Sequence, residues 1–426
     1  NSIVQFLIVS SPATYAEWTE KEFEKIAEEA YREMQNSSAL AEKLSKTYEL
    51  ELTPLAKAGQ EVCDSFFNQP LVPAMLSSSI SRAQNKPTKS SSSQAPQEKQ
   101  GEIPLGLNRE NSLVSEPINF FAKTIVSAGI PENRTHIIQV MAENAMLSNI
   151  AITVIDENDS FGALSGPAKN STELMAAGIN IEPIGFPTKK FEIKKELSID
   201  LNLVNIKGLM QLLGIGNEKI IKFIEEKQKE KKHENLDGFV EFIKQSKTNA
   251  DINQYQINKI ARIFLLVKSI YGDVFGANNP VEEISRVWVK SLGRTGIVSL
   301  KEIADGKIKL MLLHSVVKGI VEHYKAEGSS KSLKALIVLP KSSEFVGKDK
   351  DLILQNEIKD LFMEGIQYGV GHLLESEHAN DLKDELVAQF TAKLSIVSGL
   401  DTGVDLEGRT PYRVTIRPTL SKTIGK

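Results

Sequence analysis

Two adjacent acidic residues stand where an apolar run ends. Asp156 and Glu157 directly follow residues 151–155, a short run typical of a buried strand. Carboxylates at the end of a strand could hold Mg²⁺ through water molecules, and they could equally be a solvated strand end. The sequence therefore offers an acidic candidate site, with both interpretations open.

Arginines form a second set of candidates. Arg409, Arg413 and Arg417 alternate with apolar residues in the run 408–418, a pattern typical of an edge strand with one charged face. Arg294 precedes another strand-like run. An arginine presented to a neighbouring subunit can stabilise the charge of a transferring phosphoryl group, so these four residues are interface candidates; a plain exposed strand is the alternative.

Composition excludes several other kinds of site. The chain has 426 residues, of which 41% are hydrophobic and 25% charged, which is ordinary for a globular protein of two or three domains. Its one cysteine, Cys63, excludes an intramolecular disulfide, and its six histidines lack metal-ligand spacing. No GxSxG string is present. The net charge of −4 argues against a chain-wide nucleic-acid surface, although a local basic lining would not show in the sum.

A low-complexity segment predicts the clearest domain boundary. Residues 77–101 are rich in Ser, Gln, Lys and Pro and have no apolar periodicity, which indicates a flexible linker. Before it, residues 1–76 predict a small α/β domain with a strand at 3–9 and a helix at 18–34. The apolar run that begins the chain is far shorter than the roughly 20 residues of a membrane helix.

The part after the linker predicts an α/β core with a mostly parallel sheet and helices on both faces. We divide it into a first part at 102–203, a helical insert at 204–290, and a second part at 291–426 that ends in strands. Short buried strands separated by helical segments are the basis of this prediction. The predicted strands are 135–140, 151–155, 296–300, 335–339 and 392–397.

The helical insert contains a highly charged run at 225–232. One interpretation is a solvated helix end. The other is that its lysines, Lys227, Lys229, Lys231 and Lys232, contact phosphates, although the interleaved glutamates cancel much of their field.

The order of these pieces resembles the HerA- and FtsK-like ring-forming DNA motors, a group that includes the type IV secretion and DNA-import ATPases. The resemblance covers roughly residues 102–420, and residues 46–51 with the N-terminal strand and helix look loosely like the front domain of the secretion ATPases. It implies a RecA-like, P-loop-type core, a hexameric homo-oligomeric ring around DNA, and ATP with Mg²⁺ as cofactors. The segments that carry it are 135–140, 141–147, 152–157, 159–164, 293–300, 334–339, 364–371 and 373–377.

Four positions depart from that pattern. A phosphate-binding loop needs glycines, a lysine and a Ser/Thr, but no GK[ST] string occurs, and Val140 runs directly into Met141 where the loop is expected. At the Walker B strand, which should end in an acid that orients Mg²⁺, Pro340 and Lys341 follow instead. The two remaining departures are Glu377, where the family's sensor strand has Gln, and Ile366, where an arginine is usual.

These departures predict a ring subunit acting on DNA with impaired ATP hydrolysis, in which Asp156, Glu157 and Glu377 are the candidate catalytic residues and Val140 and Met141 mark the edge of the missing loop. One alternative is an active translocase or helicase whose loop is absent only from the recorded sequence, which explains one departure of the four. Another is a nucleotide-independent scaffold. Expected partners are DNA, further copies of the chain, and a nuclease or a membrane DNA-transport complex. The expected location is cytoplasmic, either free or peripheral to a membrane.

Overall fold

The computed structural model describes residues 102–169, 171–176, 182–248, 252–272, 274–276, 295–348 and 352–424. The predicted N-terminal domain, the predicted linker and Arg294 lie outside these residues. Within them, no helix combines the length and apolar character needed to cross a membrane.

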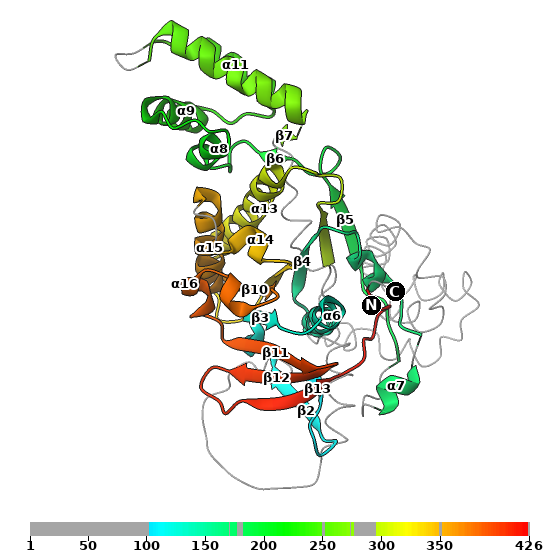
Figure 1. The fold of residues 1–426 in the computed structure, drawn as a ribbon. Helices are drawn as coiled ribbons and strands as arrows, with labels where there is room; N and C mark the ends of the chain where they lie inside the picture. Colours follow the sequence, from blue (N-terminus) through cyan, green and yellow to red (C-terminus); the bar gives the residue numbers. More distant parts are fainter. Residues whose placement is uncertain are drawn as a thin grey trace, which may run out of the picture. The chain divides into compact units, whose positions relative to one another are not determined.

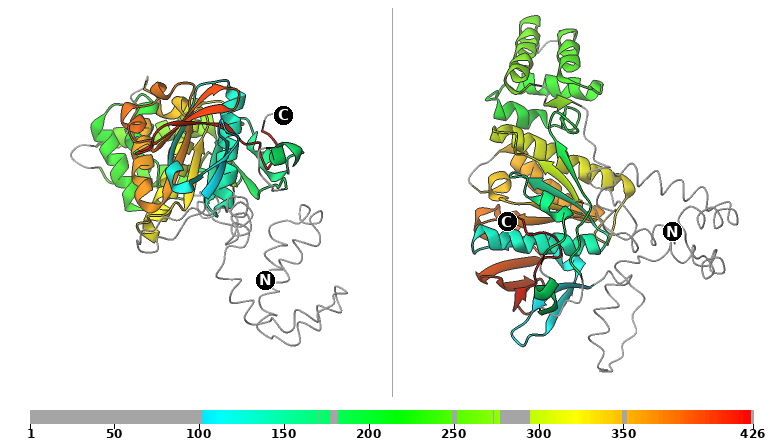
Figure 2. Two further views of the ribbon diagram at one scale, coloured as in Figure 1. Left: turned by 90° about the horizontal axis from the view of Figure 1, so that it is seen from below. Right: turned by 90° about the vertical axis from the view of Figure 1, so that its right-hand side faces the viewer.

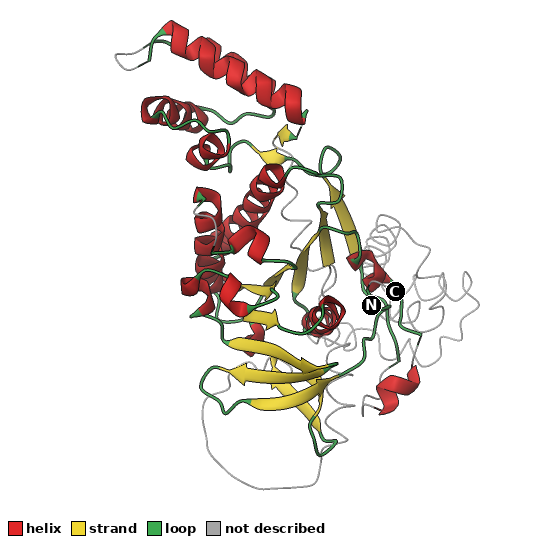
Figure 3. Cartoon of the chain, in the orientation of Figure 1, coloured by secondary structure: helices red, strands yellow, loops and turns green. Residues whose placement is uncertain are grey.

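One large sheet forms the centre of the described unit (Figure 3). Seven neighbouring strands run parallel in the order β11-β3-β10-β9-β4-β8-β5. Helices flank them on both faces, which confirms the predicted RecA-like α/β fold. The bounds are β3 (Lys123–Ser127), β4 (Ala151–Asp156), β5 (Thr188–Glu192), β8 (Thr295–Ser299), β9 (Ala335–Leu339), β10 (Val370–Glu375) and β11 (Ala392–Ser398).

Four antiparallel strands extend the sheet beyond β11. They are β1 (Glu102–Leu107), β2 (Leu113–Pro117), β12 (Asp401–Leu406) and β13 (Tyr412–Ile416), in the order β2-β1-β13-β12. The predicted edge strand in 408–418 is therefore an interior strand, because β1 pairs with β13. An interior strand with one solvated face has the same alternating pattern as an edge strand, so the sequence could not separate them.

The strand predicted at residues 135–140 is wrong. This segment lies inside helix α6 (Pro131–Leu147), and the first strand of the parallel core is β3. Pro131 at the first helical position, followed by Glu132, is a helix start signal. Buried residues surround α6 on most sides, so the helical period is masked and the β-branched pair Ile137 and Ile138 suggests a strand. The other four predicted strands correspond to β4, β8, β9 and β11.

The two faces of the sheet have different helical covers (Figure 1). Long helices α13 (Gly306–Glu327) and α15 (Ile353–Gly365) cover one face, and α6 covers the other. Side chains of β9 alternate accordingly: Ile337 and Leu339 pack with α13 and α15, and Leu336 and Val338 pack on the α6 side. The shorter elements are α7 (Ser171–Ala176), α14 (Ser343–Val346), α16 (Asp384–Val387), η1 (Ile118–Phe121), η2 (Phe161–Ser165), η3 (Ile366–Tyr368) and η4 (Ala379–Asp381).

Four helices follow β5 and the short strand β6 (Ile199–Asp200), at the opposite end of the described unit from the antiparallel strands (Figure 2). β6 pairs in parallel with β7 (Phe275–Gly276), so the chain enters and leaves this insert side by side. An asparagine caps the start of each helix by accepting a backbone N–H bond. The helices are α8 (Ile206–Leu212), α9 (Glu218–Glu230), α10 (Leu236–Lys244) and α11 (Gln254–Tyr271).

Candidate functional site

The carboxyl ends of the parallel strands form the candidate site. In open α/β sheets, ligands bind at this edge. Three residues that shortly follow strands there have left-handed backbone: Ala128 after β3 (φ 63°), Asp159 after β4 (φ 55°) and Lys341 after β9 (φ 50°). Such conformations are costly for residues with a side chain and gather at functional positions. This edge is therefore where a nucleotide site of this fold is expected.

The strand-to-helix loop at this edge consists of Ala128, Gly129 and Ile130, between β3 and α6. Val140 and Met141 do not mark its edge, because both are buried in the middle of α6. The sequence-based placement of the phosphate loop followed from the wrong strand. The loop is present, and it is short.

The guanidinium of Arg134 occupies the space enclosed by this loop. Its Nη1 donates to the carbonyl oxygens of Gly129 (2.7 Å) and Ala128 (3.3 Å), and its Nε donates to Glu375 Oε1 at the end of β10. Both charged side chains are nearly buried, at 8% and 10% exposed. A phosphate-binding loop turns backbone N–H groups toward its centre. In this loop two carbonyl groups point to a guanidinium instead.

The remaining features of the loop also disfavour an anion. The backbone N–H of Ala128 donates to the carbonyl of Glu377 (2.9 Å), and Pro131 has no N–H. Glu132 places a negative charge in the first turn of α6. Gly129 is explained by its left-handed φ and by packing, because a Cβ there would lie 2.6 Å from Ile396 Cγ2. The loop does not fit a nucleotide phosphate.

The end of β9 carries a lysine where an acid would orient Mg²⁺. Lys341 donates through its backbone N–H to Glu375 Oε2 (2.7 Å) and through Nζ to Glu157 Oε2 (3.0 Å), while Lys309 Nζ reaches Glu157 Oε1 (2.7 Å). Burial alone would raise the pKa of Glu157, but the hydrogen bonds from Lys309 and Lys341 outweigh it and hold that pKa below its ordinary value. Glu157 therefore stays ionised and bound to two lysines.

Asp156 holds the loop that follows its own strand. Its carboxylate accepts the backbone N–H groups of Phe161 (2.9 Å) and Asn158 (3.0 Å). Burial raises its pKa in spite of these bonds. Asp159, beside it, accepts from Ser299 Oγ (2.6 Å) and Lys190 Nζ (2.7 Å), and these bonds outweigh its burial and lower its pKa. The carboxylates at this edge are thus committed to partners within the chain.

Glu377 and Ile366, the two departures expected at and before the sensor strand, both lie outside β10. β10 ends at Glu375, and the side chain of Glu377, two residues further on, is exposed, so Glu375 is the glutamate that belongs to the site. Ile366 precedes β10 and lies toward the amino edge of the sheet, away from the site. The expected strand end at Glu377 is two residues too far along the chain, because strand boundaries read from a sequence are uncertain by about that much. Ile366 directly follows α15 and precedes the strand, which is where the sequence places it.

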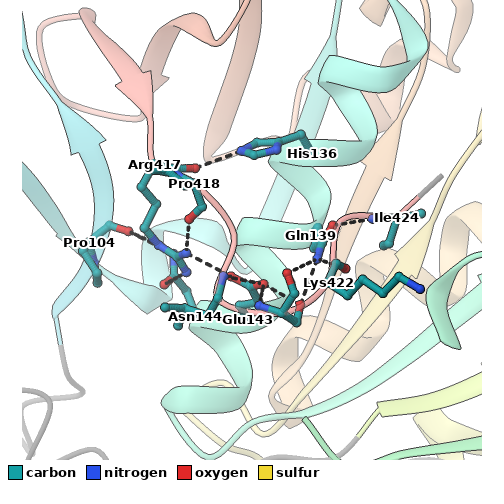
Figure 4. A network of polar contacts seen from close by, with 11 residues as sticks. Pro104, His136, Gln139, Glu143, Asn144, Arg417, Pro418, Lys422 and Ile424 are labelled. Carbon is teal, nitrogen blue, oxygen red and sulfur yellow. Dashed lines mark hydrogen bonds and ion pairs between the residues drawn. The ribbon is translucent and has the colours of Figure 1, made fainter. Parts of the chain in front are cut away.

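Arg417 is a structural residue (Figure 4). Its guanidinium binds Glu143 Oε2 (2.9 Å), Asn144 Oδ1 (2.9 Å) and the carbonyl oxygens of Pro104 and Pro418 (3.2 and 2.8 Å), and its side chain is 1% exposed. Every guanidinium nitrogen has an acceptor inside the chain. Arg417 is therefore not available to a neighbouring subunit.

The segment that follows Arg417 runs along α6 (Figure 4). Glu143 accepts the backbone N–H groups of Leu420 (3.0 Å) and Ser421 (2.9 Å) and the Ser421 hydroxyl (2.6 Å). Gln139 donates to the Ser421 hydroxyl (2.8 Å) and accepts from the backbone N–H of Ile424 (3.0 Å). The C-terminal segment is thereby fixed to the middle of α6.

The other two described arginines, Arg409 and Arg413, are both exposed. Arg409 pairs with Glu116 (2.6 Å) and lies over the Phe120 ring, 4.3 Å from its centroid. Arg413 is exposed and lies 3.7 Å from Asp401. Both stand at the antiparallel end of the sheet, and of the described candidates only these two could meet another subunit. In the described part of the chain, no three His, Cys, Asp or Glu side chains are grouped so that they could hold a metal ion.

The described core is similar to solved structures of VirB4 and of the conjugative coupling protein TrwB. No model of a known protein family matches the sequence, and no curated protein matches it. The structure of VirB4 of Thermoanaerobacter pseudethanolicus matches 74% of this chain and 96% of its own, with a TM-score of 0.51 and 11% identity. The bacterial conjugative coupling protein TrwB matches 82% of this chain and 93% of its own, with a TM-score of 0.48 and 8% identity. TrwB in complex with ADP and Mg²⁺ covers 78% of this chain and 98% of its own, with a TM-score of 0.45 and 8% identity. The likeness to VirB4 confirms the predicted RecA-like α/β fold.

Proposed function

We propose that this protein is a subunit of a DNA-transport assembly of the HerA- and FtsK-like type that does not hydrolyse ATP. The observation that carries the proposal is the Arg134–Glu375 pair, which occupies the loop where nucleotide phosphates bind in this fold. The VirB4-like fold supports the assignment to the assembly.

The chemistry of phosphoryl transfer explains why the rest of the edge supports the same conclusion. Hydrolysis needs Mg²⁺ bound near an acid and a group that orients the attacking water. Glu157 is bound to Lys309 and Lys341, and Asp156 caps its own loop. With Lys341 at the end of β9, no described strand end here presents a carboxylate without a partner in the chain. We infer that these residues now stabilise the sheet edge.

The proposal includes DNA as the substrate and a ring of several copies, hexameric by resemblance, as the working form. Peripheral contact with a membrane complex fits that setting. The exposed side chains of Arg409 and Arg413 support a contact between copies at the antiparallel end of the sheet. The second candidate function is a nucleotide-independent scaffold that binds no DNA. The occupation of the β3–α6 loop by Arg134 supports this candidate equally.

Calorimetric titration of the purified chain with ATP and Mg²⁺ tests the central point. We expect no heat of binding and no release of phosphate beyond a protein-free blank. TrwB, whose structure with ADP and Mg²⁺ is known, is the positive control in the same buffer. Binding near one nucleotide per chain would overturn the proposal and restore the active translocase.

Two further measurements separate the alternatives. The mass of the chain in solution, measured by light scattering with and without a DNA duplex, reports assembly. A ring that retains DNA supports the transport subunit, whereas assembly without DNA retention supports the scaffold.

A further inference from the structure

The helical insert has a charge opposite to that of the rest of the protein. Residues 204–271 carry 12 Lys and Arg against 8 Asp and Glu, a net charge of +4, whereas the rest of the chain carries 39 against 47 and has a net charge of −8. A local excess of positive charge on an otherwise acidic protein is typical of a surface that binds a polyanion.

Ion pairs within the insert neutralise its acids more completely than its lysines. Three of its acids are paired with lysines of the insert: Glu230 with Lys227, Glu241 with Lys244, and Asp237 with Lys268. Lys219 has a further interaction within the chain; without it, eight described basic side chains of 204–271 lie outside these three pairs, against four acidic ones. Six of the exposed ones are Lys222, Lys229, Lys231, Lys232, Lys259 and Arg262. Lys227 is committed to Glu230, so only part of the charged run 225–232 is available.

The α8–α9 turn, directly before α9, has a bare backbone at two glycines. Gly214 and Gly216 lie in it, both exposed, and a Cβ at either would meet no atom of the chain within 4 Å. Gly214 has a left-handed φ of 71°, a conformation that favours glycine over other residues. Gly216 does not have a positive φ. Neither backbone conformation nor packing within the described chain accounts for a glycine at 216. A glycine of this kind lets another molecule approach the main chain closely.

We infer that the insert, through the lysines of α9 and the bare α8–α9 turn, binds the phosphate backbone of DNA. Lys222 and Lys229 are seven residues apart and therefore lie on one face of α9, seven residues spanning about two helical turns. Lysines reach phosphates as flexible point charges and carry no sequence information, so binding is independent of base sequence and depends strongly on salt. This inference rests on the proposed function, because it names the surface that would hold the transported DNA.

Fluorescence anisotropy with a labelled duplex of random sequence tests the inference on the full chain. We expect Lys222→Glu with Lys229→Glu to weaken binding about tenfold or more, and to reduce the slope of log K against log salt by about 2. The matched control is Lys331→Glu with Lys393→Glu, which changes the net charge equally on the core and should leave the affinity within about twofold. Equal losses in the two double variants would overturn the inference.

Gly216→Glu is the sharper variant, because the fold makes no demand on this glycine. We expect its thermal unfolding to match that of the unaltered chain and its DNA affinity to fall as much as for one lysine reversal. Unchanged affinity would exclude the turn from the interface.

The remaining outcomes are separable. If the unaltered chain binds no duplex, both the inference and the DNA part of the proposed function fail, whereas binding that the insert variants leave intact contradicts the inference alone. Helix α11 also exposes Tyr255, Leu266 and Ile270, so vesicles of phosphatidylserine and phosphatidylcholine are included. Binding to vesicles in preference to DNA would overturn the assignment of the partner.

Discussion

Two buried arginine–glutamate pairs involve α6, and their settings differ. Arg417 and Glu143 meet at the middle of the helix, with side chains 1% and 0% exposed and every polar atom of the guanidinium satisfied. Arg134 and Glu375 meet near its first turn, at the rim of the sheet, and are 8% and 10% exposed. The Arg417–Glu143 pair fixes the C-terminal segment, and the Arg134–Glu375 pair occupies the β3–α6 loop.

Under the proposed function, this difference is that between a pair that was always structural and one that replaces a ligand site. A buried ion pair is tolerated only when its other donors and acceptors are satisfied. At Arg417 the satisfying groups belong to the interior of the fold, whereas at Arg134 they are the carbonyl groups of a loop that elsewhere in this fold faces phosphate. Glu143→Ala and Arg134→Ala test this contrast directly, and two further variants with smaller expected effects probe other buried polar groups.

Glu143→Ala should cost the most. It leaves the guanidinium of Arg417 buried without its counter-charge and removes the acceptor of Leu420 and Ser421, so we expect a loss of about 3–5 kcal/mol in the free energy of unfolding. Urea denaturation measures it. The exposed Arg413→Ala is the control and should change stability by about 0.5 kcal/mol or less. Similar values for the two variants would mean that the C-terminal segment is not fixed by this pair.

Arg134→Ala should cost about 1–3 kcal/mol, because Glu375 keeps its bond from the Lys341 backbone and lies close enough to solvent to be hydrated. ATP binding, measured by calorimetry, should not appear in this variant, since the loop still lacks a lysine and begins a helix with Pro131 and Glu132. Recovery of nucleotide binding would show that Arg134 alone blocks a competent site.

Glu157→Gln should change the response to acid. The pKa of Glu157 is lowered in the folded protein, so this residue contributes stability that is fully present above its unfolded value of about 4.5 and is lost as the pH falls through the lower folded value. The stability difference between the two proteins should therefore be constant at neutral pH and shrink below about pH 4.5. A difference that grows on acidification would contradict the pairing with Lys309 and Lys341.

His372→Phe should have the smallest effect. His372 is buried between Phe362 and Phe390, neither ring nitrogen has a hydrogen-bond partner in the described chain, and burial lowers its pKa to about 3. Replacing a buried polar ring by an apolar ring of similar shape removes a desolvation cost, so the unfolding midpoint in urea should stay equal or rise. A clear fall would indicate a polar partner for the imidazole.

The parallel strands were predictable where the sequence gives a compact apolar run between turn residues. Residues 335–339 and 151–155 met this condition, and β9 and β4 are there. The polar residues of Lys123–Ser127 hide β3 from a search for apolar runs, and the apolar residues that surround α6 give residues 135–140 the pattern of a strand. The error moved the expected phosphate loop from Ala128 to Val140.

The candidate site could be predicted only in part. Asp156 and Glu157 are adjacent in the sequence and end a recognisable strand, so the sequence can present them as candidates. The pair of Arg134 with Glu375 joins residues 241 positions apart, and no local pattern reports such a contact. The same holds for Arg417, whose spacing suggested an exposed strand while its partners Glu143 and Asn144 lie on a distant helix.

The place of β13 has a consequence for folding during synthesis. β1 and β2 pair with each other, and their only link to the rest of the sheet is through β13. A ribosome therefore makes the hairpin of residues 102–117 first and its sheet neighbour at 412–416 about 300 residues later. At about 5–20 residues per second, the hairpin's edge and the buried carboxylate of α6 wait for tens of seconds without their partners. During that interval the nascent chain exposes an unpaired strand edge, so we expect its folding yield, more than the stability of the finished protein, to depend on chaperones.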